Sequence, residues 1–212
     1  MSDAPERRFI GRAGLVKRLR LMEGEAGETT YRDGEVRIVR ASEDLRIRPA
    51  FPLHHSSAYD VVRVSPLIEE LERDRIVAVL LVRLGGFVAG VLEGESIVAS
   101  KVGSRFVKGR HRAGGSSANR FRRRREKQAR ELVEDAGETG LEILTPWLDR
   151  VEHVALGGDR AAIRAVLERT PQARVLEERA LPRFFTVPEP RLRVLEAFPY
   201  DLYSSWVEVG DR

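Results

Sequence analysis

The sequence predicts an α/β protein in which a mixed β-sheet is covered by helices. Residues 76–84 form an apolar run rich in β-branched side chains, which is typical of a buried strand. Two more strand-like runs follow after turns, and the stretch after residue 117 carries apolar side chains at helical spacing. A further strand and helix over residues 151–169 complete a pattern that favours a mixed sheet with flanking helices.

The first 55 residues contain shorter elements. Residues 12–20 predict a short helix, because Leu15, Val16 and Leu19 fall on one side of it. Residues 35–39 and 45–47 alternate as short strands do, and a connector that contains prolines follows them. We therefore interpret residues 1–55 as a small N-terminal subdomain or extension and residues 56–212 as the main domain.

The centre of the chain predicts a three-stranded meander. A compact helix with a proline at its start covers residues 66–73 and leads to the buried strand over 76–84. A glycine pair turns the chain into a strand over 87–92, and a Glu-Gly-Glu turn leads to a third strand over 96–107. The third strand leads directly into a basic loop that contains a second glycine pair.

The rest of the chain predicts further helices and strands. A long helix over residues 117–135 carries most of its arginines outward, and a second helical piece broken by a proline follows it. Asp159 is placed to cap a helix that extends to residue 169, directly after the strand over 151–156. We expect extended segments over 171–179, 184–187 and 191–197, before an aromatic tail with Tyr200, Tyr203 and Trp206.

Positive charge is concentrated in one segment. Residues 101–130 hold 12 of the 37 Lys and Arg residues and only one of the 33 acidic residues, Glu126. A solvated helix face normally carries balancing acids, so their absence here favours an anionic partner. The turn over residues 114–117 lies between two basic arms, which predicts that a glycine-rich tip is presented to RNA while arginines hold the phosphates.

The composition argues against several other classes of function. The chain has no cysteine and only four scattered histidines, so we expect no disulfide, no metal site and no cofactor. It shows neither a secretory signal nor an apolar run of membrane-spanning length, and we expect a cytoplasmic protein without a membrane partner. Glycine motifs for nucleotide phosphates are absent, and the meander carries its acids only in a turn, which disfavours a metal nuclease.

The segment around the second glycine pair resembles a known family. Residues 114–121 read Gly-Gly-Ser-Ser-Ala-Asn-Arg-Phe, and Arg123, Arg125 and Glu126 follow on the predicted helix. This arrangement resembles the central domain of archaeal and eukaryotic class 1 release factors, where a Gly-Gly-Gln loop precedes an arginine-bearing helix. It is more similar to the Vms-like release factor family of bacteria, and residues 101–110 and 120–125 are similar to its actinobacterial branch.

The resemblance implies an RNase H-like α/β sheet and the activity of a ribosome-rescue peptidyl-tRNA hydrolase. Its implied partners are the ribosome, through the peptidyl transferase centre of the large subunit, peptidyl-tRNA and ribosomal RNA. The implied catalytic residues are Gly114, Gly115, Ser116, Ser117 and Asn119. The implied RNA contacts are Lys101, Arg105, Lys108, Arg110, Arg112, Arg120, Arg122, Arg123, Arg124 and Arg125.

The chain departs from the family pattern at one position. The family's glutamine is absent, since residues 116–119 read Ser, Ser, Ala and Asn, and the nearest glutamine is Gln128. Backbone N–H groups at positions 115–117 and the neighbouring polar side chains are then expected to stabilise the oxyanion and order the water. The alternative is a non-catalytic protein that binds ribosomes or RNA through the same fold and basic clamp.

Overall fold

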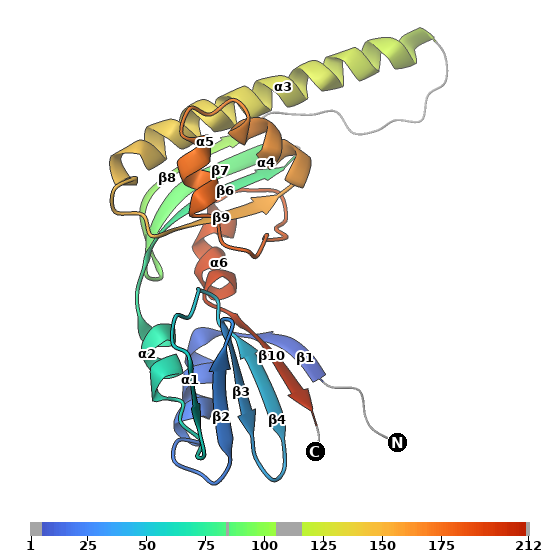
Figure 1. The fold of residues 1–212 in the computed structure, drawn as a ribbon. Coiled ribbons are helices and arrows are strands. Elements are labelled where there is room, and N and C mark those ends of the chain that lie inside the picture. Colours follow the sequence, from blue (N-terminus) through green and yellow to red (C-terminus); the bar gives the residue numbers. More distant parts are fainter. Residues whose placement is uncertain (1–5, 84, 105–115, 211–212) are drawn as a thin grey trace. The chain divides into compact units, whose positions relative to one another are not determined.

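The computed structural model describes residues 6–83, 85–104 and 116–210, and it contains two compact units (Figure 1). The first unit comprises Met1–Arg73 and Tyr200–Arg212, and the second comprises Asp74–Pro199. Each unit has its own β-sheet with helices packed against it. The first unit thus extends beyond the sequence-predicted boundary at residue 55 and includes the C-terminal strand.

The first unit is a six-stranded antiparallel sheet with two helices. The strand order is β1-β10-β4-β3-β2-β5, so the last strand of the chain lies between the first and the fourth. The bounds are β1 (Glu6–Ile10), α1 (Arg12–Arg20), β2 (Glu28–Arg32), β3 (Glu35–Val39), β4 (Asp44–Arg48), β5 (Ser57–Tyr59), α2 (Ser65–Glu72) and β10 (Ser205–Gly210).

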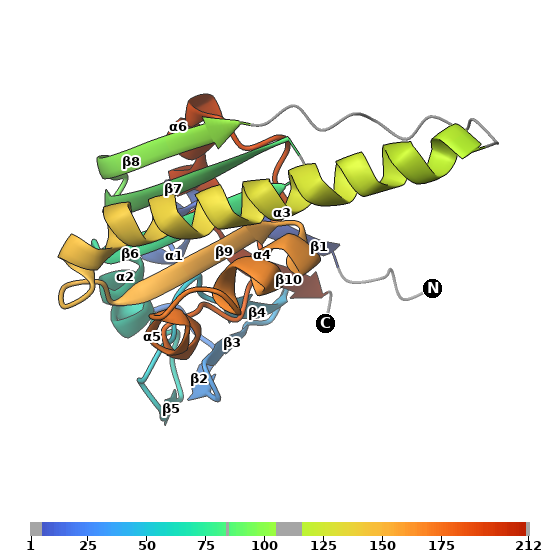
Figure 2. The same ribbon diagram turned by 90° about the horizontal axis from the view of Figure 1, so that it is seen from above.

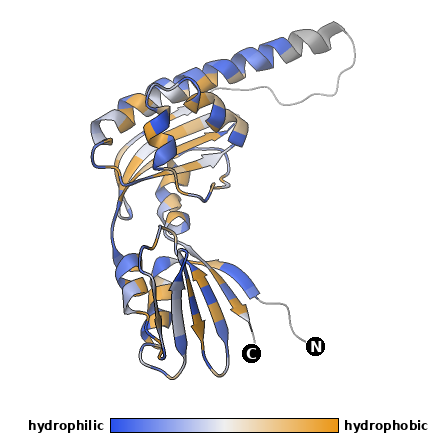
Figure 3. Ribbon diagram, in the orientation of Figure 1, coloured by the Kyte–Doolittle hydropathy of each residue, from blue (hydrophilic) through white to orange (hydrophobic). Residues whose placement is uncertain are grey.

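Alternating side chains build the core of this unit. Strands β3 and β4 carry buried apolar residues at every second position, which Figure 3 shows as alternating colours. Helix α1 buries Leu15, Val16 and Leu19 against one face of the sheet, as the sequence predicts. Helix α2 begins with a proline in its first turn, and the carboxylate of Glu23 accepts hydrogen bonds from the backbone N–H groups of Val64 and Ser65 at 2.6 and 3.0 Å.

The second unit is a four-stranded mixed sheet with helices on its faces (Figure 2). The order is β8-β7-β6-β9; the first three strands are an antiparallel meander, and β9 is parallel to β6. The bounds are β6 (Ile76–Arg83), β7 (Gly86–Glu93), β8 (Ser96–Ser104), α3 (Ser116–Leu144), η1 (Thr145–Trp147), β9 (His153–Gly158), α4 (Arg160–Leu167), α5 (Ala173–Glu178) and α6 (Leu192–Leu202). Helix α6 continues past the boundary of the unit at Tyr200.

The second half of α3 covers this sheet. Leu132, Val133, Ala136 and Leu144 are buried with the apolar residues of β6 and β7 in one core. Helix α4 packs beside it. Asp159 caps this helix as predicted, because its carboxylate accepts hydrogen bonds from the backbone N–H groups of Ala161 and Ala162. The predicted mixed sheet with flanking helices is confirmed for this unit.

Three predictions of local structure in this unit are wrong. Residues 171–179 and 191–197 contain the helices α5 and α6 rather than extended segments. In α6, Leu195, Phe198 and Leu202 are buried at helical spacing, and Pro199 near the end of the helix conceals that pattern in the sequence. The predicted separate helical piece over 141–148 is the end of α3 followed by a 3-10 turn.

Candidate functional site

Only part of the sequence-predicted site lies within the described residues. The backbone of the first turn of α3 includes Ser116, Ser117 and Asn119. The next turn includes Arg120 and Arg122. The side chains of these five are not among those described. Six predicted site residues lie outside the described residues altogether: Gly114, Gly115, Arg105, Lys108, Arg110 and Arg112.

The strand that leads to the tip is tightly packed against its neighbour. Gly103 lies opposite Phe87 on β7, and an added Cβ at position 103 would stand 2.2 Å from the Phe87 ring. The absence of a side chain therefore lets the aromatic ring lie against the backbone of β8 one residue before the strand ends at Ser104. This contact holds the described end of β8 against β7.

Helix α3 carries the predicted arginines beyond the sheet. The first buried residue of the helix among those described is Leu132, whereas Arg123 and Arg124 are exposed and Arg125 is half-buried. At 1.5 Å per residue, the helix begins about 24 Å before Leu132. Figures 1 and 2 show this half of α3 extending past the strands, and the ribbon of its described residues is mostly coloured as hydrophilic in Figure 3.

The charge of α3 is divided between its two halves. The half before Glu131 carries all the basic residues of the helix, and the half from Glu131 onward carries acids only. The macrodipole favours acids at the N-terminus of a helix and bases at its C-terminus, so this order opposes helix stability at both ends. Stabilisation of the helix therefore does not account for the arginines.

Lys101, one of the predicted RNA contacts, forms an ion pair with the acidic half of α3. Its Nζ atom lies 2.5 Å from a carboxylate oxygen of Glu142, so the ammonium group joins β8 to the acidic half of α3. Both side chains are substantially exposed, and the pair contributes at most about 1 kcal/mol to stability.

Three arginines that the sequence analysis did not single out lie at the same end of the second sheet. Arg83 and Ser104 both pair with the first residue of β7, and Arg160 begins α4 directly after the parallel strand β9. The Arg160 guanidinium lies 4.2 Å from the centroid of the Phe184 ring. The Arg183 guanidinium lies 4.6 Å from the centroid of the Phe185 ring. These residues come from distant segments, and only the strand pairing shows that they lie at one end of the sheet.

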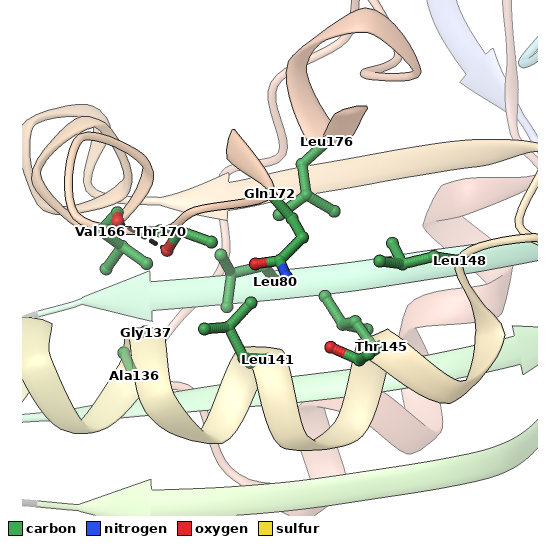
Figure 4. A pocket seen from close by; sticks show the side chains of 12 residues that line it. Leu80, Ala136, Gly137, Leu141, Thr145, Leu148, Val166, Thr170, Gln172 and Leu176 are labelled. Carbon is green, nitrogen blue, oxygen red and sulfur yellow. Dashed lines mark hydrogen bonds between the residues drawn. The ribbon is translucent and has the colours of Figure 1, made fainter. Parts of the chain in front are cut away.

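A small apolar hollow lies between α3, β6 and the α4–α5 region (Figure 4). Leu80, Leu141 and Leu176 line it, and the carboxamide of Gln172 points into it. The hydroxyl of Thr170 at its edge donates a hydrogen bond to a backbone carbonyl of α4 at 2.8 Å. No acidic, basic or histidine side chain lines this hollow, so it offers no general acid or base.

Searches for other kinds of site are negative within the described part of the chain. Across residues 6–83, 85–104 and 116–210, no three His, Asp or Glu side chains gather closely enough to hold a metal ion. Of the helices that the structure describes, none combines the length and apolar content required to cross a membrane. The projecting half of α3 and the residues that precede it therefore remain the candidate site.

Comparison with known proteins gives consistent relationships. Peptide chain release factor subunit 1 of Archaeoglobus fulgidus is 29% identical over 110 residues, which cover 52% of this chain and 26% of that relative. The crystal structure of an archaeal translation termination factor, aRF1, aligns with a TM-score of 0.45 and 17% identity over 91% of this chain and 55% of that one. The Vms1 mitochondrial localization core aligns with a TM-score of 0.44 and 16% identity over 90% of this chain and 79% of that one.

The chain thus spans about a quarter of the length of the curated relative that it matches. The family model described as "Actinobacteria/chloroflexi VLRF1 release factor" matches residues 75–208, which include the whole sheet of the second unit, the helix with the arginines and most of the C-terminal strand. Because this match covers more than half of the chain, the protein belongs to the actinobacteria/chloroflexi VLRF1 release factor family.

Proposed function

We propose that the protein is a peptidyl-tRNA hydrolase that releases nascent chains from stalled ribosomes or large subunits. The observation that carries the proposal is the basic half of α3, which directly follows the glycine pair. It begins about 24 Å before Leu132, the first buried residue among the described side chains of the helix. A projecting basic rod with a small, Cβ-free tip suits entry into a narrow RNA cavity. The proposed partners are the large subunit, its ribosomal RNA and peptidyl-tRNA, in the cytoplasm.

The proposed reaction is hydrolysis of the ester that joins the peptide to the terminal ribose of the tRNA. Water attacks the ester carbonyl, the bond to the ribose oxygen breaks, and this oxygen takes up a proton as the peptide leaves with a carboxyl group. Gly114 and Gly115 let the backbone approach RNA closely, because they lack a Cβ. The rate would then be raised by orientation of the attacking water and by exclusion of bulk solvent from the reacting groups.

The polar residues after the glycines take the place of the family's glutamine in this proposal. Ser116, Ser117 and Asn119 order the attacking water through their hydroxyl and amide groups. The backbone N–H groups at the start of α3 stabilise the developing oxyanion, and the positive end of the helix dipole adds to this effect. The arginines that follow neutralise ribosomal RNA phosphates and hold the tip in position.

A release assay tests the proposal directly. Stalled large subunits that carry a labelled nascent peptide are incubated with the protein, and free peptide is separated from peptidyl-tRNA over time. Release above the rate without protein supports hydrolysis. Binding to the subunits without release above background would contradict the proposal.

The absence of the family's glutamine favours a second candidate function, in which the protein binds ribosomes or RNA without catalysis. This candidate shares the salt-sensitive binding of the first, because both depend on contacts between arginines and phosphates. It differs in the release assay, where it predicts binding alone.

The double substitution Arg123→Ala with Arg124→Ala is expected to weaken binding to large subunits and to reduce its salt dependence. Both side chains are exposed on the projecting half of α3, so their loss removes charge without disturbing the core. Each lost phosphate contact should lower the slope of log K against log salt by about 0.7–0.9. Binding measured by sedimentation across a range of salt concentrations checks this prediction.

The matched control is Arg164→Ala with Arg169→Ala, which removes the same charge from exposed positions on and just after α4. These positions lie away from the projecting half of α3 in sequence and are not predicted to contact RNA. An equal loss of affinity and slope in both double variants would show that only net charge matters, which contradicts a specific role for α3.

A further inference from the structure

Three parallel segments of the second unit end side by side. Strands β6 and β9 pair in parallel, and Phe185 bridges Gly157 in parallel on the other side of β9. Strand β8 ends there too, because β6 and β8 are both antiparallel to β7. We call this end the carboxyl end of the sheet. Figure 2 shows the arrowhead of β8 at this end, on the side from which α3 projects.

Two exposed arginines are held at the carboxyl end by uncharged groups. Arg83 is the last residue of β6, and its guanidinium donates a hydrogen bond of 2.9 Å to the backbone carbonyl of Val187. Arg160 is the first residue of α4, and its guanidinium lies over the Phe184 ring. A carbonyl and an aromatic ring orient a guanidinium without neutralising it. Because each guanidinium has five N–H donors, several remain for a further partner.

The backbone brings these two arginines close together. The N–H of Asp159 donates a hydrogen bond of 2.7 Å to the carbonyl of Val82, across the ends of β9 and β6. Arg160 and Arg83 are the residues that directly follow the two partners of this bond. The pair therefore forms one local feature of the carboxyl end, although it comes from two distant segments of the chain.

The acidic side chains at this end are engaged by other groups. The Asp159 carboxylate accepts hydrogen bonds from two backbone N–H groups of α4, where the positive end of the helix dipole offsets its charge. Glu189 forms an ion pair with Arg191 at 3.0 Å. Within the described part of the chain, no carboxylate forms an ion pair with Arg83 or Arg160. The two guanidinium groups thus lack an anionic partner among these residues.

The position of the pair indicates which anionic partner it meets. The basic half of α3 projects from the same end of the same unit, with Arg123 and Arg124 exposed. A partner that encloses the projecting length of the helix reaches the body of the unit where the sheet ends, and there it meets Arg83 and Arg160. A cavity walled by RNA presents phosphates at its rim, and guanidinium groups bind phosphates in a fork geometry.

We propose that Arg83 and Arg160 bind phosphates of ribosomal RNA at the mouth of the cavity that α3 enters. This inference rests on the proposed entry of α3 into the large subunit, and it does not depend on catalysis. The contact holds the base of the projecting helix, whereas the arginines of α3 hold the helix nearer its tip. The direction of the helix is then fixed by contacts at two separate places.

Hydroxyl-radical cleavage from a single thiol locates the RNA. The chain has no cysteine, so Ala161→Cys places one thiol beside Arg160 and retains both arginines. An iron–EDTA group on this thiol, in protein bound to large subunits, should cleave ribosomal RNA at a few defined positions. The matched control is Asp149→Cys, because Asp149 is exposed and precedes β9 at the opposite end of the sheet. The control should leave these positions uncut.

A third thiol separates failure of this inference from failure of the proposed function. Ala118→Cys places the iron in the first turn of α3. Cleavage from position 118 without cleavage from position 161 would leave the entry of α3 intact and overturn the contact at the carboxyl end. Cleavage from neither position would contradict both. A photocross-linker on the thiol at position 161 that captures only ribosomal protein would overturn the contact in favour of a protein partner.

The salt dependence of binding measures the contribution of the two charges. Arg83→Gln with Arg160→Gln should weaken sedimentation with large subunits and lower the slope of log K against log salt by about 0.7–0.9 for each lost phosphate contact. Arg169→Gln with Arg174→Gln removes the same charge from exposed positions after α4 and on α5. This control should leave the slope unchanged, and an equal decrease in both double variants contradicts a specific contact.

A charge-retaining variant separates the charge from the packing of these side chains. Arg83→Lys with Arg160→Lys keeps both positive charges, but it removes the guanidinium contacts with Val187 and Phe184. The lysine variant should keep most of the salt dependence, because an ammonium group still binds a phosphate. A slope as low as that of the glutamine variant would show that packing alone is responsible, and it would overturn the inference.

Discussion

Gly115→Ala is expected to lower the rate of peptide release by about 100-fold or more, because a displacement of about 1 Å at the reacting groups has an effect of this size. The Cβ of alanine keeps the tip backbone away from RNA, and it restricts the backbone angles that glycine can adopt. Affinity for the large subunit should change little, because the arginines that contact phosphates are retained. Single-turnover release at saturating protein, with sedimentation for affinity, measures the two effects separately.

Gly137→Ala is the matched control for this experiment. Gly137 lies in the covered half of the same helix, where an added Cβ would meet its nearest neighbours at 3.7 and 3.8 Å, which is ordinary contact. This variant should release peptide at the rate of the wild-type protein. Full release activity in Gly115→Ala would exclude the glycine pair as the catalytic tip, whatever the behaviour of the control.

Gly158→Ala is expected to reduce the unfolding free energy of the second unit by about 3 kcal/mol or more, from backbone strain and overpacking together. Gly158 ends β9 with a φ of +100°, a conformation that alanine rarely adopts. An added Cβ would lie 2.1 Å from the backbone carbonyl oxygen of Val82 on β6. Neither backbone segment can move away without breaking the parallel pairing of β6 and β9.

The two tryptophans allow the units to be measured separately. Trp147 lies in the second unit and Trp206 in the first, so denaturant unfolding in a Trp206→Phe background reports on the second unit. Gly137→Ala in the same background should raise the unfolding free energy by about 0.5–1 kcal/mol, because alanine stabilises a helix interior relative to glycine. A Gly158→Ala midpoint close to that of the wild-type protein would contradict the predicted strain.

The meander and the long helix could be predicted from the sequence because their patterns are local. Residues 76–84 are almost continuously apolar, and the structure buries this strand between two neighbours. Asp159 was identified as a helix cap from the glycines before it and the apolar spacing after it. Helix α6 was not identified, because an alternating segment and an internal proline resemble an extended strand unless the burial of Leu195 and Phe198 is known.

The prediction of the candidate site also depends on a local pattern, and the roles of its residues stay predictions. Clustering of arginines before Glu131 and the adjacent glycine pair are properties of a continuous segment, and they indicate an RNA-directed tip without knowledge of the fold. The pairing of Lys101 with Glu142 was not predictable, because these residues are brought together by the packing of α3 on the sheet. The positions of Arg83, Arg160 and Arg183 at one end of the sheet likewise depend on strand register.

The sequence by itself determined the class of fold, the order of the central elements and the segment that carries the positive charge. These follow from the local periodicity of apolar residues and from charges that are neighbours along the chain. Only the tertiary structure showed that β10 lies between β1 and β4, and that Phe9, Trp206 and Arg48 form a row. Pairing between the two ends of a chain depends on the burial of a shared core, and no pattern within either end specifies it.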